Sequence, residues 1–115
     1  MTKKIVTSNP LFEVKDLFGR RIRTTSDYWQ KIKTLKHQEL NYGILEVKNT
    51  LTNPEEVRRS VTDFTILLYA QKQKKYDILI VAVKVLNGDG FLVTVYQTKE
   101  FKKKGELLWP KRKEK

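Results

Sequence analysis

Basic and hydroxyl-bearing side chains alternate with apolar ones in the C-terminal half of this chain, and these are the residues that could carry chemistry. Arg58, Lys84 and Tyr96 occur in stretches rich in β-branched and aromatic residues, so strands there would turn them toward one face of a sheet. Two cations and a phenol could stabilise the negative charge that develops on a phosphodiester when a ribose 2′-hydroxyl attacks it. We predict that these three residues are catalytic, with solvated outer-face side chains as the alternative interpretation.

His37 is the single histidine of the chain, and the ordinary pKa of imidazole suits proton transfer near neutral pH. We predict it as the acid or base of the same reaction. It also falls where a predicted helix ends, and a positively charged imidazole is favourable at a helix C-terminus for structural reasons alone. Both interpretations fit its position.

The net charge favours a polyanionic partner. Twenty-four Lys and Arg residues against thirteen Asp and Glu residues give a formal charge of +11, which favours nucleic acid or an anionic membrane surface. We predict that RNA is the partner and that its phosphates bind hydroxyl-bearing and lysine side chains on the same sheet face and just after it. These are Ser60, Tyr69, Thr94, Thr98, Lys99, Lys102 and Lys103.

Composition excludes several classes of protein. The chain has no cysteine and one histidine, which excludes a disulfide framework, a thiolate metal site and a histidine-based zinc cluster. It contains no P-loop, no G-x-G-x-x-G and no nucleophile elbow, so we predict no metal site and no cofactor. The first residues, Met1–Thr7, lack the long apolar stretch typical of a signal peptide, and no apolar run is long enough to cross a membrane, which predicts a cytoplasmic protein without a membrane partner.

A length of 115 residues allows one domain. We predict an N-terminal segment over 1–10, a single α+β domain over 11–98 and a basic C-terminal tail over 99–115. In the N-terminal part, Gly19 between two short alternating runs predicts a hairpin or extended arm. Apolar residues at helical spacing then predict one helix that begins at Thr25–Asp27 and ends near His37, and a second from Asn41 to Asn53.

From Glu56 onward the hydrophobic period changes to two. This period predicts four strands, at Val57–Val61, Phe64–Gln71, Tyr76–Leu86 and Phe91–Thr98. Their short connections predict a four-stranded antiparallel meander, with both helices packed on one face. Trp29, at helical spacing with apolar neighbours, is expected in the core.

The turn at Gly88-Asp89-Gly90 sets which side chains share a face. A three-residue turn with Gly90 in the left-handed conformation would pair Lys84 with Thr94 and Ala82 with Tyr96. The helix-covered face would then hold Ile66, Leu68, Leu79, Val81, Val83, Val85, Phe91, Val93 and Val95. The other face would be basic and rich in hydroxyls, with Ser60, Tyr69, Lys84, Thr94, Tyr96 and Thr98, joined by Arg58 if Val57 and Val61 turn inward.

Five short motifs resemble a known family. They are the run Asp16–Arg23, Trp29-x-x-Ile32, His37-Gln38-Glu39, the stretch from Thr50 to Ser60 that contains Asn53-Pro54-Glu55-Glu56-Val57, and Thr94-x-Tyr96-x-Thr98. Over about residues 11–110 the chain resembles the PBECR domains, a bacterial and phage group placed near barnase, EndoU, certain colicin tRNases and RelE-like toxins. The resemblance implies helices followed by an antiparallel sheet, and metal-independent ribonuclease activity.

Carried over by position, the resemblance assigns His37 to the family's His-Pro-Glu-like element, Arg58 and Ser60 to the start of the sheet, and Tyr96 and Thr98 to its last strand. Family members often carry a histidine two residues after the tryptophan and an arginine two residues after the tyrosine of the second strand. This sequence has Lys31 and Gln71 there, so one proton-transfer partner of the family pattern is absent.

Three functions fit these observations. The first is a toxin-like, metal-independent endoribonuclease that acts on RNA phosphodiesters. The second is a non-catalytic nucleic-acid-binding module that uses the same face. The third is a basic scaffold protein that binds an acidic partner such as an antitoxin. Cleavage of RNA in excess EDTA separates the first from the others, and salt-dependent RNA binding without cleavage selects the second.

Overall fold

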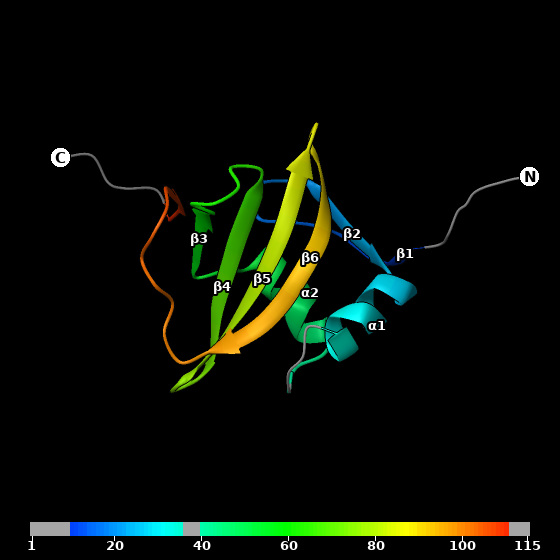
Figure 1. Ribbon diagram of the computed structural model, residues 1–115. Coiled ribbons are helices and arrows are strands. Elements are labelled where there is room, and N and C mark those ends of the chain that lie inside the picture. The colour runs from blue at the N-terminus through cyan, green and yellow to red at the C-terminus, as the bar shows by residue number, and fades with distance from the viewer. Residues whose placement is uncertain (1–9, 36–39, 111–115) are drawn as a thin grey trace, which may run out of the picture.

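The computed structural model describes residues 10–35 and 40–110, which form a mostly-sheet α+β protein (Figure 1). The described ranges contain two helices and seven strands. In chain order these are β1 (Pro10–Lys15), β2 (Arg21–Thr25), α1 (Ser26–Leu35), α2 (Ile44–Thr52), β3 (Glu56–Arg59), β4 (Ile66–Lys74), β5 (Asp77–Leu86), β6 (Asp89–Thr98) and β7 (Leu107–Trp109).

The strands belong to one mixed sheet in the order β1-β2-β6-β5-β4-β3-β7. The predicted four-stranded antiparallel meander is therefore wrong. The strands from β3 to β6 run antiparallel in sequence order, but β2 joins the sheet parallel to β6, with Ile22 beside Gly90. The β1–β2 hairpin is thus part of the same sheet, and β7 adds an antiparallel strand on the far side of β3.

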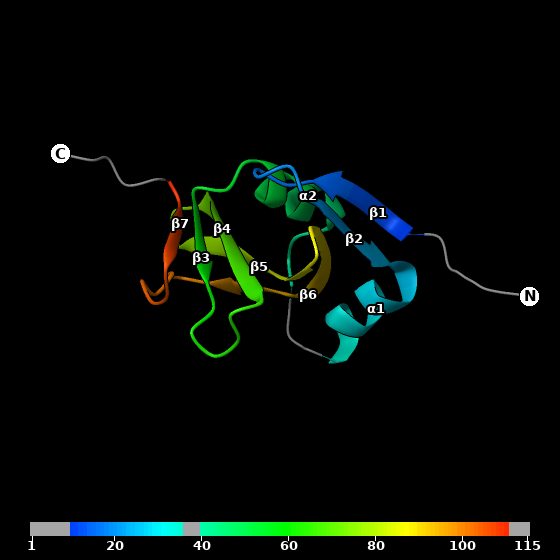
Figure 2. The same ribbon diagram turned by 90° about the horizontal axis from the view of Figure 1, so that it is seen from above.

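Two contacts between distant parts of the chain produce the larger sheet. Ile22 is fully buried, and its place in the core brings β2 against the start of β6. After β6, residues 99–106, which we call the returning segment, pass along the sheet to its other edge, where Leu107–Trp109 forms β7 beside β3 (Figure 1, Figure 2). These residues fall in the stretch that the sequence assigned to the tail. Strand partners so far apart leave no periodic signal in the sequence.

The main core lies between the helices and one face of the sheet. Helix α2 packs against β4, β5 and β1 and lies behind the sheet in Figure 1, while α1 packs beside β2 and β6. Trp29 and Ile32 of α1 and Val47 and Leu51 of α2 are buried in this core. The predicted core position of Trp29 is confirmed.

Local hydrogen bonds set where the helices begin. The Thr25 hydroxyl accepts a hydrogen bond from the Tyr28 N–H at 3.2 Å, which satisfies a free donor in the first turn of α1. Gly43 precedes α2, and its N–H donates to the Glu46 carboxylate at 2.9 Å. Helix α2 therefore begins at Ile44 and not at Asn41, because Gly43 takes the capping position.

The β5–β6 turn differs from the predicted one. Asn87 and Gly88 have positive φ values of 53° and 85°, and Leu86 pairs with Asp89, so the turn has two residues. Gly90 lies within β6, where a Cβ would overlap Ile22 and lie 2.9 Å from Val83 Cγ1. The predicted left-handed role of Gly90 is wrong, because close packing and not backbone conformation requires a glycine there.

A bulge in β6 restores the alternation that the tight turn would otherwise break. Ala82 pairs with Thr94 and Val83 with Leu92, which leaves Val93 as the extra residue. Lys84 consequently lies opposite Phe91, and Tyr96 opposite Ile80. The predicted pairs of Lys84 with Thr94 and of Ala82 with Tyr96 are wrong.

We call the sheet face away from the main core the outer face. Its cross-strand rows are Arg23–Phe91–Lys84–Ile66, Thr94–Ala82–Leu68–Arg58, and Tyr96–Ile80–Ala70–Glu56. Lys84 and Tyr96 lie on it, opposite the buried Val81 and Val83, as the alternation predicted. It is not an open polar surface, however, because Ile80, Ala82 and Ala70 are also buried.

Four predicted face assignments are wrong. Tyr69 and Leu67 face the main core and are buried, so Ile66 and Leu68 lie on the outer face. The run from Ile66 to Ala70 is apolar on both faces, so its pattern does not select one of them. Phe91 also lies on the outer face and is 42% exposed. Val61, whose inward turn was the condition for placing Arg58 on the outer face, is 59% exposed, yet Arg58 lies on that face.

Tyr69 connects the sheet to the loop between β1 and β2. Its hydroxyl donates a hydrogen bond to the carboxylate of Asp16, whose side chain is fully buried. The same carboxylate accepts hydrogen bonds from the Phe18 and Arg20 N–H groups at 2.9 and 2.8 Å. Burial and the neighbouring Asp16 carboxylate raise the pKa of the Tyr69 phenol. Tyr69 is therefore a structural residue of the core.

Candidate nucleic-acid interface

The predicted catalytic residues Arg58, Lys84 and Tyr96 share the outer face but are not adjacent. They lie on β3, β5 and β6 in three different cross-strand rows. With strands about 4.8 Å apart and residues about 3.4 Å apart, their Cα atoms are roughly 12–16 Å from one another. One phosphate cannot contact all three through short hydrogen bonds.

Hydrogen bonds within the protein hold the Arg58 guanidinium in place. Its guanidinium donates hydrogen bonds to the Glu56 carboxylate and, at 2.9 Å, to the Gly105 carbonyl oxygen, and its side chain is 14% exposed. Lys103 donates to the other oxygen of Glu56 at 2.8 Å. Burial opposes the charge on Glu56, but the hydrogen bonds from Lys103 and Arg58 outweigh it and lower the pKa of that carboxyl. Arg58 therefore fastens the returning segment to β3.

Lys84 also has a carboxylate neighbour. Its ammonium lies 3.7 Å from Asp63, with both side chains about two-fifths exposed. Hydrogen bonds from Thr65 and the nearby Lys84 charge lower the pKa of Asp63. Exposed pairs of this kind contribute little stability, so Lys84 can exchange this partner for another anion.

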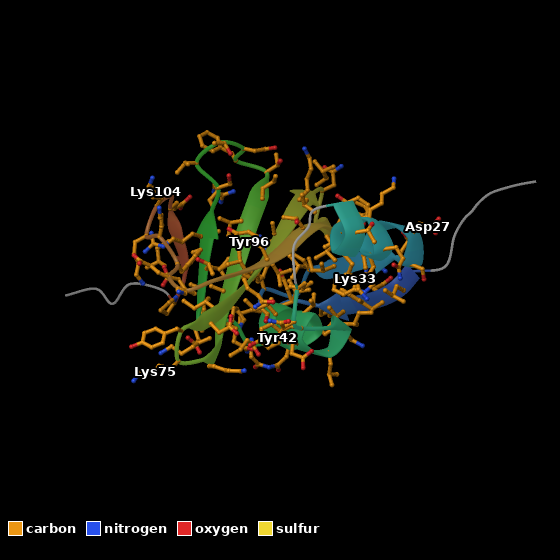
Figure 3. The ribbon with its side chains drawn as sticks, turned by 60° about the horizontal axis from the view of Figure 1, so that its bottom comes forward. Asp27, Lys33, Tyr42, Lys75, Tyr96 and Lys104 are labelled. Carbon is orange, nitrogen blue, oxygen red and sulfur yellow. The ribbon has the colours of Figure 1, made fainter. Side chains whose placement is uncertain are left out.

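A groove opens where the returning segment passes the outer face. It has a volume of about 320 Å³. Its lining consists of side chains from β4, β6, the β3–β4 loop and the returning segment: Ser60, Val61, Leu68, Tyr96, Thr98, Glu100, Phe101, Lys102 and Lys104. Figure 3 shows Tyr96 over the middle of the sheet and Lys104 toward its β7 edge. We call this the outer groove.

The outer groove combines hydroxyl donors, an aromatic ring and lysine ammonium groups. Tyr96 is 38% exposed, and partial burial raises the pKa of its phenol, so the hydroxyl keeps its proton and can donate a hydrogen bond at neutral pH. The Thr98 hydroxyl donates to the Glu100 carbonyl oxygen at 3.0 Å. Among the described residues, ion pairs engage Lys84 and Lys103 but not Lys102 or Lys104. These last two ammonium groups are available to phosphate.

Of the predicted RNA-binding residues, Ser60 and Thr98 line the outer groove together with Lys102 and Tyr96. Thr94 lies on the outer face opposite Ala82, and Lys99 is exposed just after β6. Lys103 neutralises Glu56, and Tyr69 is in the core. His37 lies outside the described residues.

Sequence reasoning missed five residues of the outer groove: Val61, Leu68, Glu100, Phe101 and Lys104. The sequence places the last three of these in the basic C-terminal tail over 99–115, where only Lys99, Lys102 and Lys103 are predicted to bind RNA. Phe101 is the available sequence signal, because an aromatic residue among lysines indicates that a segment packs on a surface; the structure shows its ring partly buried.

No family model, curated protein or solved structure matches the chain. Across residues 10–35 and 40–110, no three His, Asp or Glu side chains gather to hold a metal ion. Neither described helix has the length and apolar character needed to cross a membrane.

Proposed function

We propose that this protein binds RNA along the outer face, with phosphates held in the outer groove. The observation that carries the proposal is the convergence of Tyr96, Lys102 and Lys104 on one groove. The two ammonium groups have no acidic partner among the described residues, and the net charge of +11 favours a polyanion. The resemblance to PBECR domains supports the same class of partner.

The test is the salt dependence of RNA binding. Each phosphate contact on a single strand contributes about 0.7 to the slope of log K against log[salt]. The double variant Lys102→Ala/Lys104→Ala should bind a fluorescein-labelled RNA more weakly and lower that slope by about 1.4. The control is Lys33→Ala, which removes a lysine ammonium group from α1 (Figure 3) and should leave the slope unchanged. Equal slopes for both variants would exclude the outer groove as the phosphate site.

A second candidate function is metal-independent cleavage of the bound RNA. The specific observation in its favour is that Glu100, an acidic residue, lines the outer groove together with Tyr96, Thr98 and the two lysines. A carboxylate can take the proton of a 2′-hydroxyl as its oxygen attacks the phosphorus, while ammonium groups stabilise the phosphate charge. The bond from phosphorus to the 5′-oxygen then breaks, and the departing oxygen takes a proton from water. In this proposal Lys102 and Lys104 take the electrostatic role that the sequence assigned to Arg58 and Lys84.

The assay for cleavage uses total RNA and tRNA in excess EDTA. Loss of a general base or acid slows such a step by about 10²–10⁴-fold. We expect Glu100→Gln to slow cleavage in this range, while RNA affinity stays within a few-fold. His37→Ala tests the imidazole separately. If RNA binds with the expected salt slope but stays intact in EDTA, the cleavage proposal is wrong and the RNA-binding proposal stands.

A further inference from the structure

Resting on the proposed RNA-binding function, we propose that the bound RNA is single-stranded and that two of its bases stack on Phe91 and Tyr96. Both rings belong to β6 and both lie on the outer face. They are 42% and 38% exposed, respectively. Exposed aromatic rings on the face of an antiparallel sheet are well suited to hold unstacked bases.

Phe91 has its own hollow beside cationic groups. The hollow has a volume of about 310 Å³ and includes Arg23, Tyr28 and Lys84 in its lining. The Arg23 guanidinium lies 5.2 Å from the centre of the Phe91 ring, and Lys84 is the cross-strand neighbour of Phe91. A base that stacks on this ring therefore brings its phosphate close to two positive charges.

The ion pairs around Phe91 do not block this hollow. Arg23 lies 3.4 Å from Asp89 and 3.8 Å from Glu13, and each of these side chains is about one-third exposed. Surface pairs with this much solvent contact are weak, so phosphate can compete for Arg23.

The spacing of the two rings selects the form of the RNA. Their cross-strand partners Lys84 and Ile80 are four residues apart on β5, which corresponds to about 14 Å along the strand. Successive bases of a duplex strand lie only about 3.4 Å apart and cover each other's faces. Two bases that reach Phe91 and Tyr96 must therefore leave the stack, which a flexible single strand does readily.

Ring substitutions measured against single-stranded and duplex RNA test this inference. The probe is a short fluorescein-labelled RNA strand, used alone and annealed to its complement, in anisotropy titrations at one salt concentration. Phe91→Ala and Tyr96→Ala should each weaken single-strand binding by about 5- to 150-fold, the range for loss of one stacked base. Phe91→Tyr should retain most of the affinity, because it keeps the ring. Tyr96→Phe should bind more tightly than Tyr96→Ala, because it keeps the ring and loses only the hydroxyl that can donate to phosphate.

Tyr76→Ala is the matched control. Tyr76 is 67% exposed and has the Lys75 ammonium 5.5 Å from its ring centre, but it lies in the turn between β4 and β5. Its loss should leave affinity unchanged. Unchanged thermal unfolding of the Phe91 and Tyr96 variants will show that they remain folded, as expected for half-exposed side chains.

The failure of this inference is distinguishable from the failure of the proposed function. Single-strand binding that depends on Lys102 and Lys104 but not on either ring overturns the stacking inference and leaves RNA binding in place. Tighter binding of the duplex than of the single strand also overturns it. Absence of RNA binding by the unmodified protein at low salt overturns the proposed function itself.

Discussion

Replacing Tyr69 with phenylalanine tests whether this residue is structural or binds RNA. The sequence pattern placed it on the RNA-binding face, whereas the structure buries it completely and directs its hydroxyl to the buried Asp16 carboxylate. The substitution removes only the hydroxyl and keeps the ring in the core. It therefore isolates one hydrogen bond to a charged group.

The expected loss of stability follows from that hydrogen bond. A hydrogen bond to a charged group contributes about 1.5–3 kcal/mol, and a buried acceptor that loses a donor pays a desolvation penalty. Asp16 keeps the Phe18 and Arg20 N–H groups, so we expect about 2 kcal/mol for Tyr69→Phe. With a urea m-value of about 2 kcal/mol/M, the unfolding midpoint should fall by about 1 M.

The assay is urea unfolding at neutral pH. RNA binding is then measured without urea, where both proteins are folded. Tyr76→Phe, which changes an exposed tyrosine, should alter stability by less than about 0.5 kcal/mol. A double-mutant cycle with Asp16→Asn should give a coupling energy of about 0.5–3 kcal/mol between the two side chains. Unchanged stability together with weakened RNA binding would refute the buried placement of Tyr69.

Three further outcomes are expected. Gly90→Ala should destabilise the fold by about 1–3 kcal/mol in urea unfolding, because a Cβ there meets Ile22 and Val83 in a packed core. Unchanged stability would mean that β2 does not pack closely against β6. Gly105→Ala should lower the free energy of unfolding by more than about 1 kcal/mol, because Gly105 has a φ of +84° and a Cβ would overlap the Arg59 carbonyl oxygen. The same variant should weaken RNA binding in anisotropy titrations, because it displaces the returning segment. An unchanged affinity would show that this segment is not part of the RNA-binding site. The folded-state pKa of Glu56 lies below its ordinary 4.5, so its contribution to stability should be present above about pH 4.5 and lost as the pH falls through the lowered value. Urea unfolding across that range should show a shallower acid loss for Glu56→Gln than for the unmodified protein, and parallel curves would contradict the pairing with Lys103 and Arg58.

Local patterns in the sequence were sufficient to predict several features. The change of hydrophobic period near Glu56 predicted where helices end and strands begin, because a period of 3.6 or 2 is set within each element. The same alternation placed Lys84 and Tyr96 on the face opposite Val81 and Val83, since the side-chain direction along one strand needs no information about its partner.

The tertiary structure alone decided the strand order, the register and the composition of the site. The parallel pairing of β2 with β6 depends on burying Ile22 in a core built by other elements. Tyr69 sits in a run that is apolar on both faces, so an offset of one residue was enough to reverse its assignment. The outer groove exists because residues 99–106 fold back over the sheet, fastened through Arg58 and Lys103 to Glu56. Contacts between segments so far apart in sequence follow from packing in three dimensions, and local periodicity does not encode them.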